Sequence, residues 1–361
     1  MGLKLDFQKY TLDFKFEAGT SRGILTSRDI WIIKILDEAS PQVFGLGEAG
    51  PLQGLSIDDR PDFVDRLNSL KKQIANHLVP GIEEIYSFVE LLIGEEFPSI
   101  RFALETALLD LVNGGKRIIF DNPFSRGEAE IPINGLVWMG DKAFMLSQID
   151  SKIEAGYDCL KMKIGAINFE QELEILSYIR KHFKALTLRV DANGAFSADE
   201  ALEKLKRLSA FDLHSIEQPI KPGYREVMHT LCADSPVPIA LDEELIGISE
   251  SSKKRNLLSD IKPQYIILKP TLLGGIKSSK DWIKTANEAG VGWWFTSALE
   301  SHIGLNAIIQ LSGQFNLSGH QGLGTGQLYH NNFSSPLKIK SGKLRSDPGN
   351  SWNFRSLQLV R

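Results

Sequence analysis

The stretch Tyr157-Asp158-Cys159-Leu160-Lys161-Met162-Lys163-Ile164-Gly165 has the two-residue alternation of a short β-strand. Three of its apolar residues fall on one side, whereas Lys161 and Lys163 fall on the other. Two ammonium groups on the same side of a strand repel each other. This repulsion, combined with partial burial, can lower the pKa of a lysine and make it a proton acceptor. A pair of solvated surface lysines is the alternative, and the residues downstream decide between the two.

This stretch belongs to a series of strand and helix segments that begins near residue 130. The unit recurs at intervals of roughly 25 to 30 residues, which is typical of parallel βαβ units. Eight units favour a closed (β/α) barrel over an open doubly wound sheet. No Gly-x-Gly-x-x-Gly follows the first strand, which argues against a dinucleotide site. The predicted strands are residues 132–137, 159–163, 187–191, 214–217, 238–242, 265–269, 293–297 and 321–323.

The first third of the chain has a different pattern. Residues 3–50 contain four alternating or apolar segments separated by turn residues, which predicts an antiparallel sheet. Its predicted strands are residues 3–10, 11–16, 29–36 and 43–48. From residue 57 to residue 115 the apolar residues recur at three- and four-residue steps, and the strongest predicted helix is 99–111. We therefore predict an α+β unit before the barrel.

Length and composition limit the class of protein. A chain of 361 residues has room for one large and one smaller domain. Its net charge of -4 gives no electrostatic reason to expect nucleic acid or an anionic membrane as a partner. The two cysteines argue against a disulfide framework, and no apolar run reaches membrane-spanning length. We therefore expect a cytoplasmic protein, and its oligomeric state stays open.

Charged residues stand at the ends of five successive predicted barrel strands. They are Lys163, Asp191, Glu217, Asp242 and Lys269, each about one repeat from the next. Barrel enzymes carry their chemistry at this edge, where the carboxyl ends of the strands meet. Three converging carboxylates repel one another unless a proton or a cation lies between them, and Mg²⁺ prefers such oxygen ligands. In the alternative, each acid caps a helix or pairs with a surface lysine.

Five short motifs at these strand ends resemble those of the enolase superfamily, specifically its muconate-lactonizing subgroup. They are Lys161-Met-Lys163, Val190-Asp-Ala-Asn193, Ile216-Glu-Gln-Pro219, Ala240-Leu-Asp-Glu243 and Ile267-Leu-Lys-Pro270. The resemblance spans nearly the whole chain. It implies a modified TIM-type (β/α)7β barrel at residues 126–325. It also implies an α+β capping domain, formed by residues 1–125 and completed by the C-terminal tail 326–361.

The resemblance also implies roles for the strand-end residues. Enzymes of this superfamily combine a lysine or histidine base with Mg²⁺. Here the implied ligands of Mg²⁺, for which Mn²⁺ can substitute, are Asp191, Glu217 and Asp242. The implied catalytic residues are Lys163 and Lys269, which would flank a small-molecule carboxylate substrate on opposite faces. A carboxylate bound to Mg²⁺ has a more acidic α-proton, which a lysine can then remove.

The loops indicate which members of the subgroup are most similar. The stretch Phe295-Thr-Ser-Ala-Leu-Glu-Ser-His-Ile-Gly304 resembles the o-succinylbenzoate synthase family, as do Thr20-Ser-Arg-Gly23 and Gln321-Gly-Leu-Gly-Thr-Gly326. That resemblance implies a lyase that dehydrates 2-succinyl-6-hydroxy-2,4-cyclohexadiene-1-carboxylate in menaquinone biosynthesis. Glu300 is interpreted as a residue that orients its loop. The predicted substrate-binding residues are Lys161, Asn193, Ser297, Gly322 and Arg22.

Other functions stay open. N-acylamino acid racemases and dipeptide epimerases of the same subgroup use the same two lysines. Dipeptide epimerases tend to carry an acidic pair near the eighth strand, and residues 322–327 contain no acid. The glycines there also fit a phosphate-binding loop, although no Lys or Arg stands beside them. A non-catalytic binding protein would lack a ligand or a lysine, and none of the five is missing.

Overall fold

The computed structural model describes residues 2–20, 23–347 and 349–360. The chain begins with an antiparallel sheet whose strands, in order, are β1 (Leu3–Thr20), β2 (Gly23–Asp37) and β3 (Phe44–Ala49). The predicted break between residues 10 and 11 is wrong, because β1 pairs without interruption with β2 from Leu3 to Asp13. No glycine, proline or asparagine stands at that point to form a turn, so the extended backbone continues.

Helices cover one face of this sheet. They are α1 (Phe63–Ile74), the short 3₁₀ helix η1 (Ile82–Glu84), α2 (Ile85–Leu92) and α3 (Pro98–Val112). The predicted helix 99–111 is α3, and Pro98 opens it because the fixed φ of proline suits the first helical position. Asp58 caps it from outside, since its Oδ2 accepts hydrogen bonds from the backbone N (2.8 Å) and the Oγ (2.6 Å) of Ser99.

Strand β3 lies directly against α3, and two glycines allow the close approach. A Cβ atom at Gly47 would lie 1.9 Å from the carbonyl oxygen of Ala103, and one at Gly45 would lie 1.8 Å from that of Ala107. Both obstacles are backbone atoms within a helix, so neither can rotate away. Any side chain at these positions would therefore separate the sheet from its main helix.

Gly47→Ala is expected to lower the free energy of unfolding by roughly 3 kcal/mol, the upper end of the range for overpacking. Denaturant unfolding followed by circular dichroism measures the change. Gly319→Ala is the control, because the nearest atom to its added Cβ would be 3.9 Å away. That variant is expected to stay within about 0.5 kcal/mol of the parent chain. If Gly47→Ala and Gly319→Ala were equally stable, the predicted clash between residue 47 and α3 would be wrong.

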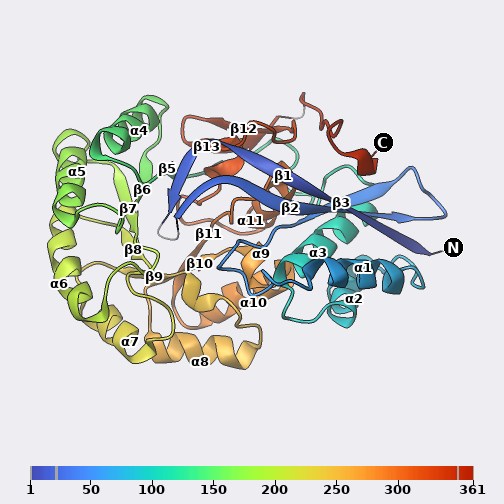
Figure 1. The fold of residues 1–361 in the computed structure, drawn as a ribbon, viewed down its shortest axis with the longest axis horizontal. Helices are drawn as coiled ribbons and strands as arrows, with labels where there is room; N and C mark the ends of the chain where they lie inside the picture. Colours follow the sequence, from blue (N-terminus) through green and yellow to red (C-terminus); the bar gives the residue numbers. More distant parts are fainter. Residues whose placement is uncertain (1, 21–22, 348, 361) are drawn as a thin grey trace.

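The second part of the chain is a curled parallel sheet surrounded by helices (Figure 1). Its strands, in spatial order, are β5 (Gly135–Val137), β6 (Cys159–Lys163), β7 (Thr187–Asp191), β8 (Ser215–Glu217), β9 (Ile239–Leu241), β10 (Tyr265–Leu268) and β11 (Gly292–Phe295). The helices between and after them are α4 (Lys142–Glu154), α5 (Phe169–His182), α6 (Ala198–Leu208), η2 (Ser209–Phe211), α7 (Arg225–Asp234), η3 (Glu243–Leu245), α8 (Ser251–Ile261), α9 (Pro270–Leu273), α10 (Gly275–Glu288), α11 (His302–Ser312) and η4 (Gly324–Gln327).

The eighth predicted strand, residues 321–323, forms parallel bridges instead of a full strand. Ile133 pairs with Gln321, and Thr296 pairs with Gly322. Hydrogen bonds join this segment to both edges of the sheet: Asn134 N donates to Gln321 O (3.0 Å), and Gly322 N donates to Phe295 O (2.7 Å). The segment therefore connects the first and seventh strands, and the (β/α)7β architecture is present.

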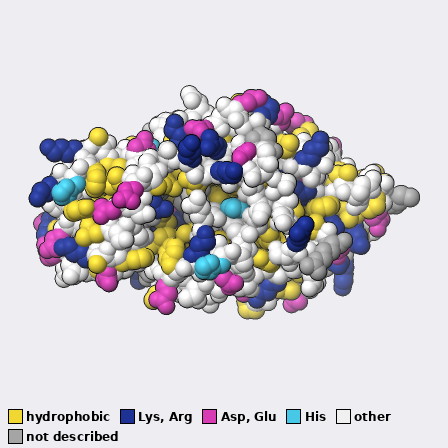
Figure 2. Space-filling view, turned by 90° about the horizontal axis from the view of Figure 1, so that it is seen from above, with side chains coloured by type: hydrophobic (Ala, Val, Ile, Leu, Met, Phe, Trp, Pro, Cys, Tyr) yellow, Lys and Arg dark blue, Asp and Glu magenta, His cyan; other side chains and the backbone are white. Residues whose placement is uncertain are grey.

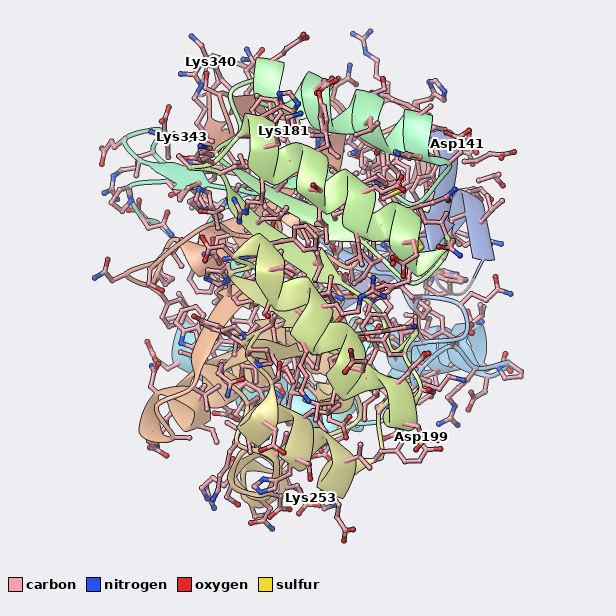
Figure 3. All side chains as sticks on the ribbon, turned by 90° about the vertical axis from the view of Figure 1, so that its left-hand side faces the viewer. Asp141, Lys181, Asp199, Lys253, Lys340 and Lys343 are labelled. Atoms are coloured by element: carbon pink, nitrogen blue, oxygen red, sulfur yellow. The ribbon has the colours of Figure 1, made fainter. Side chains whose placement is uncertain are left out.

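The barrel helices share one direction (Figure 3). Asp141 accepts a hydrogen bond from Phe144 N (2.8 Å) at the start of α4, and Asp199 lies in the first turn of α6. Both lie on the right in Figure 3, on the side of the N-terminal strands, whereas Lys181, in the last turn of α5, lies toward the opposite edge. Acids at helix starts and bases at helix ends complement the helix dipole. In parallel βαβ units each helix runs antiparallel to its strands, so the helix starts and the carboxyl ends of the strands lie on the same side. The carboxyl ends of the strands therefore face the N-terminal sheet.

The C-terminal tail contacts both parts of the molecule. Strands β12 (Leu337–Lys340) and β13 (Lys343–Ser346) form a hairpin that pairs with β4 (Glu130–Pro132) ahead of the barrel. The end of the tail, with η5 (Gln358–Val360), lies beside β1 and β2 in Figure 1. There Leu359 N donates to Gln8 Oε1 (3.0 Å), and Leu357 is fully buried in the same apolar cluster as Leu12.

The surface carries charges of both signs. Figure 2 shows Lys and Arg side chains intermixed with Asp and Glu over the face in view, with hydrophobic side chains between them. Among the described residues, no helix combines the length and the apolar character that crossing a membrane requires.

Candidate active site

The five predicted strand-end residues come together at the carboxyl end of the barrel. Lys161 Nζ lies 2.8 Å from Asp191 Oδ2 and 2.8 Å from Glu217 Oε2. Lys163 Nζ contacts the same Asp191 oxygen at 2.8 Å. On the other side, Lys269 Nζ pairs with Asp242 Oδ2 and lies 3.8 Å from Glu217 Oε1. The two lysines of β6 therefore point the same way, as their alternation predicts, and they contact carboxylates at the ends of the next two strands, β7 and β8.

The ion pairs of Lys161 contradict the expectation that repulsion from Lys163 lowers its pKa. Burial opposes the charged form of Lys161, but the charges of Asp191 and Glu217 outweigh burial and raise its pKa. Lys269 behaves in the same way, because Asp242 and Glu217 outweigh burial and raise its pKa. Repulsion between neighbouring lysines is thus a smaller effect than attraction to the acids of the next strands.

The three carboxylates are buried, and their environments differ. Burial opposes ionisation of Asp191, yet the lysines outweigh burial and hold its pKa well below the ordinary value. Burial and the neighbouring charge of Asp191 raise the pKa of Glu217 to about 7. Burial also raises the pKa of Asp242, although Lys269 opposes the shift. Burial, together with the neighbouring charge of Asp191, therefore leaves Glu217 only partly ionised near neutral pH.

The donor atoms of these three acids show whether a divalent cation fits the site. Glu217 Oε1 is buried and has no hydrogen-bond partner, and its carboxylate and the other two offer only oxygen donors, which suit Mg²⁺. Within the part of the chain that the structure describes, no three acidic, histidine or cysteine side chains already stand in a metal-binding arrangement, because lysine ammonium groups lie between the acids. The residues fit a cation that would replace these ion pairs.

Asn193 connects Lys163 to Glu243 at the edge of the cluster. Its Oδ1 accepts a hydrogen bond from Lys163 Nζ (2.5 Å), and its Nδ2 donates to Glu243 Oε1 (2.9 Å). Its φ of 44° is left-handed, a conformation that asparagine tolerates better than most residues. The turn after β7 therefore directs the amide of Asn193 back over the strand end.

A cavity of about 940 Å³ opens beside the cluster, within the size range of small-molecule sites. Six of the predicted residues line it: Lys161, Lys163, Asn193, Lys269, Ser297 and Gly322. The predicted Arg22 lies outside the described residues. Asp191, Glu217 and Asp242 lie beneath the lining and are held by its lysines. The opposite wall comes from the N-terminal part of the chain, including Phe16, Leu25 and residues 52–55.

The turn after β11 has a defined hydrogen-bond network. Ser297 Oγ donates to Glu300 Oε2 (2.5 Å) and accepts from Thr325 Oγ1 (2.7 Å), and Glu300 Oε1 accepts from Thr271 Oγ1 (2.5 Å). Glu300 therefore holds groups from the sixth and seventh strand ends together, in line with the loop-orienting interpretation. Ser297 Oγ also accepts from Leu299 N (3.0 Å), so its donor and acceptor capacity is already used within this turn.

Sequence reasoning missed the residues that join this turn to the N-terminal sheet. Arg28 and Glu48 come from β2 and β3 and are buried against the turn and the start of α11. Each is a charged residue in an otherwise alternating strand, a pattern typical of any half-exposed sheet. No local signal in the sequence separates such a buried charge from an exposed one.

Comparison with known proteins matches this architecture. Residues 145–356 match the family model described as enolase C-terminal domain-like. The chain belongs to the enolase superfamily. Enzymes of this superfamily generally use Mg²⁺, and the three buried acids of this chain lie at or next to the carboxyl ends of barrel strands.

Individual relatives in the superfamily extend the match over the whole chain. The chain is 44% identical to the o-succinylbenzoate synthase of Desulfotalea psychrophila, over 95% of this chain and 99% of that protein. The crystal structure of MenC from the same organism superposes with a TM-score of 0.86 at 41% identity, covering 96% of this chain and all of that one. A muconate lactonizing enzyme from Pseudomonas fluorescens has the same fold, with a TM-score of 0.86 at 22% identity and coverage of 100% and 99%.

Proposed function

We propose that this superfamily member is an o-succinylbenzoate synthase, a lyase that converts 2-succinyl-6-hydroxy-2,4-cyclohexadiene-1-carboxylate into o-succinylbenzoate and water in menaquinone biosynthesis. The observation that carries the proposal is the 44% identity to such a synthase over nearly the full length of both chains. The cavity supports it, because lysines and carboxylates at five successive strand ends surround a space suited to a small carboxylate substrate.

In the proposed reaction, Lys163 removes the proton α to the substrate carboxylate as the general base. The electron pair of the broken C–H bond forms the ring double bond, and the C–O bond to the hydroxyl breaks. Lys163 then returns its proton to the departing hydroxyl, so that water leaves and the ring becomes aromatic. Lys269, from the opposite side of the cavity, stabilises the negative charge that develops on the carboxylate. Lys161 lies beside Lys163 and contributes further positive charge.

Asp191, Glu217 and Asp242 are proposed to hold Mg²⁺, or Mn²⁺ in its place. The bound cation would supply Lewis-acid stabilisation of the carboxylate when its α-proton is removed. Asn193, through its contacts with Lys163 and Glu243, keeps the base at the edge of this cluster. The remaining proposed substrate contacts are Ser297, Gly322 and Arg22.

A division of labour between two domains follows from the same proposal. Residues 126–325 would form the catalytic barrel, and residues 1–125, with the tail 326–361, would form the cap over its mouth. The cavity supports this division, because barrel residues such as Lys163 and N-terminal residues such as Leu52 line it together.

Purified protein incubated with the cyclohexadiene carboxylate and Mg²⁺ is expected to form o-succinylbenzoate, with kcat on the order of 1–10³ s⁻¹ as for typical enzymes. The rise in ultraviolet absorbance of the aromatic product measures the rate. Heat-inactivated protein with the same metal is the control. Product formation no faster than in that control would remove the assignment.

Racemisation of N-acylamino acids is the second candidate. It requires two bases on opposite faces of the substrate, and both Lys163 and Lys269 line the cavity. Dipeptide epimerase activity has less support, since residues 322–327 provide no acid for a substrate amine. In the same assay series, each enantiomer of an N-succinyl amino acid in D₂O would lose its α-proton if racemisation occurs, and nuclear magnetic resonance would detect the exchange.

A further inference from the structure

Arg28 of β2 makes contacts that join two parts of the molecule. Its side chain is 6% exposed and does not line the cavity. One guanidinium nitrogen, Nη1, donates a hydrogen bond to the carbonyl oxygen of Ala298, and the other, Nη2, donates to that of Gly50. Hydrogen bonds from a charged donor are stronger than neutral ones. Arg28 therefore connects the segment after β3 to the turn after β11.

One acceptor, Ala298, lines the cavity, and the other, Gly50, begins a segment that lines it. Segment 50–55, which follows β3, places Leu52, Gln53, Gly54 and Leu55 on the lining. Turn 297–299, which follows β11, places Ser297, Ala298 and Leu299 on it. One wall thus comes from the N-terminal sheet and the other from the barrel, and the same guanidinium contacts the backbone of both. The spacing between the two walls depends on this side chain.

The turn needs outside support, because its backbone is strained. Leu299 has a φ of 68°, which is unfavourable for a residue with a branched side chain. Leu299 N donates to Ser297 Oγ (3.0 Å), and Tyr329 Oη donates to Leu299 O (2.7 Å). Strained turns at functional sites persist only where several contacts specify them, and the bond from Arg28 to Ala298 is one of these contacts.

The sequence of segment 50–55 is adapted to the guanidinium. A Cβ atom at Gly50 would lie 2.5 Å from Arg28 Nη2. The backbone of Gly50 does not have a left-handed φ, so the reason for glycine is this close approach and not the turn itself. The absence of a side chain at Gly50 therefore leaves the space that the Arg28 guanidinium occupies.

One buried carboxylate, Glu48, interacts with the same arginine, and a second, Glu300, lies near Glu48. Glu48 and Glu300 are both fully buried, and Glu48 accepts hydrogen bonds from Ser301 N (2.9 Å) and Gly304 N (3.0 Å) at the start of α11. Burial raises the pKa of Glu48, although the positive charge of Arg28 opposes the shift. Removing the guanidinium would take the nearby positive charge away from buried Glu48, so stability has to be measured beside function.

We propose that Arg28 is a positioning residue for substrate binding, which holds segment 50–55 and turn 297–299 at the spacing that the substrate requires. It does so from outside the cavity, through backbone carbonyls. The kinetic part of the test rests on the proposed synthase function, whereas the hydrogen-exchange part does not.

The test compares Arg28→Met with Arg117→Met. Arg117 is a matched control: it is 7% exposed, pairs with Asp110 at 2.9 Å and donates to the carbonyls of Phe44 and Gly115, but it lies away from the cavity. We expect Arg28→Met to raise KM roughly 10- to 100-fold, as misplaced binding groups do. Its kcat should change by less than about threefold, since the chemical groups stay in place. Arg117→Met should lower Tm to a similar degree and leave KM unchanged.

Two further variants refine the test. Arg28→Lys keeps the charge but reaches only one of the two carbonyls, so its KM should lie between those of the parent and Arg28→Met. Gly50→Ala displaces the guanidinium without changing charge and should also raise KM. Equal KM values for the parent and Arg28→Met, or an equal rise in Arg117→Met, would overturn the proposal.

Hydrogen–deuterium exchange supplies a readout that needs no substrate. Arg28→Met should speed amide exchange in both segment 50–55 and turn 297–299, whereas Arg117→Met should speed neither. Faster exchange in only one of these two segments would contradict the proposal that Arg28 connects them. If the parent chain formed no o-succinylbenzoate, the proposed function would fail, and the exchange result would still decide whether Arg28 holds the two walls.

Discussion

Lys163→Ala is expected to lower kcat for o-succinylbenzoate formation by about 10²–10⁴-fold, the usual value of a general base. It should also abolish exchange of the substrate α-proton with solvent. Lys163 contacts Asp191 and Asn193 and lines the cavity, and its side chain is 12% exposed, against 6% for the neighbouring Lys161. Rates of product formation, together with proton exchange in a slowly reacting analogue, measure the two effects.

Lys269→Ala is the matched comparison for this prediction. Losing a positive charge near a developing anion can slow the reaction as much as losing the base, so the overall rate does not separate the two lysines. Exchange does, because Lys269→Ala should retain measurable washout of the α-proton and Lys163→Ala should retain none. The reverse pattern would assign the base to Lys269. Loss of exchange for one enantiomer in each variant would instead indicate two-base racemisation.

Removal of divalent cations is expected to reduce turnover to the background rate, and added Mg²⁺ should restore it. The physical reason lies in the acids: Asp191, Glu217 and Asp242 are buried together, and burial with the charge of Asp191 raises the pKa of Glu217 to about 7. Dialysis against EDTA followed by titration with Mg²⁺ or Mn²⁺ measures the dependence. Full activity after complete chelation would contradict the proposed metal site.

Glu217→Gln tests the dependence on a divalent cation by changing one proposed metal ligand. The amide keeps the shape of the side chain but removes the charge, so kcat should fall by about 10²–10³-fold and Mn²⁺ binding, measured by electron paramagnetic resonance, should weaken. Glu244→Gln is the control, because Glu244 is also buried near this edge but contacts Gln218 and Gly223 N instead of the lysines. Equal Mn²⁺ affinity in the two variants would argue against Glu217 as a ligand.

The sequence by itself determined the repeat of the barrel and the residues at its mouth. Alternation in strands and the one-unit spacing of Lys163, Asp191, Glu217, Asp242 and Lys269 are local properties, and parallel strands necessarily carry their carboxyl ends to one edge. The helix α3 was predictable for the same reason, since Pro98 and its apolar spacing mark it locally. The division of β1 into two strands was wrong, because turn formation depends on residues that this segment lacks.

Only the tertiary structure decided which charges meet. Spacing shows that Lys161 and Lys163 lie on one side of β6, but the raised pKa of Lys161 comes from acids on β7 and β8. The contacts of Arg28 likewise join positions far apart in the chain, Gly50 and Ala298. Electrostatic interactions depend on distance in space and on burial. A sequence specifies both only through the complete fold, so the gathering of these side chains at one edge was predictable, and their ionisation and support were not.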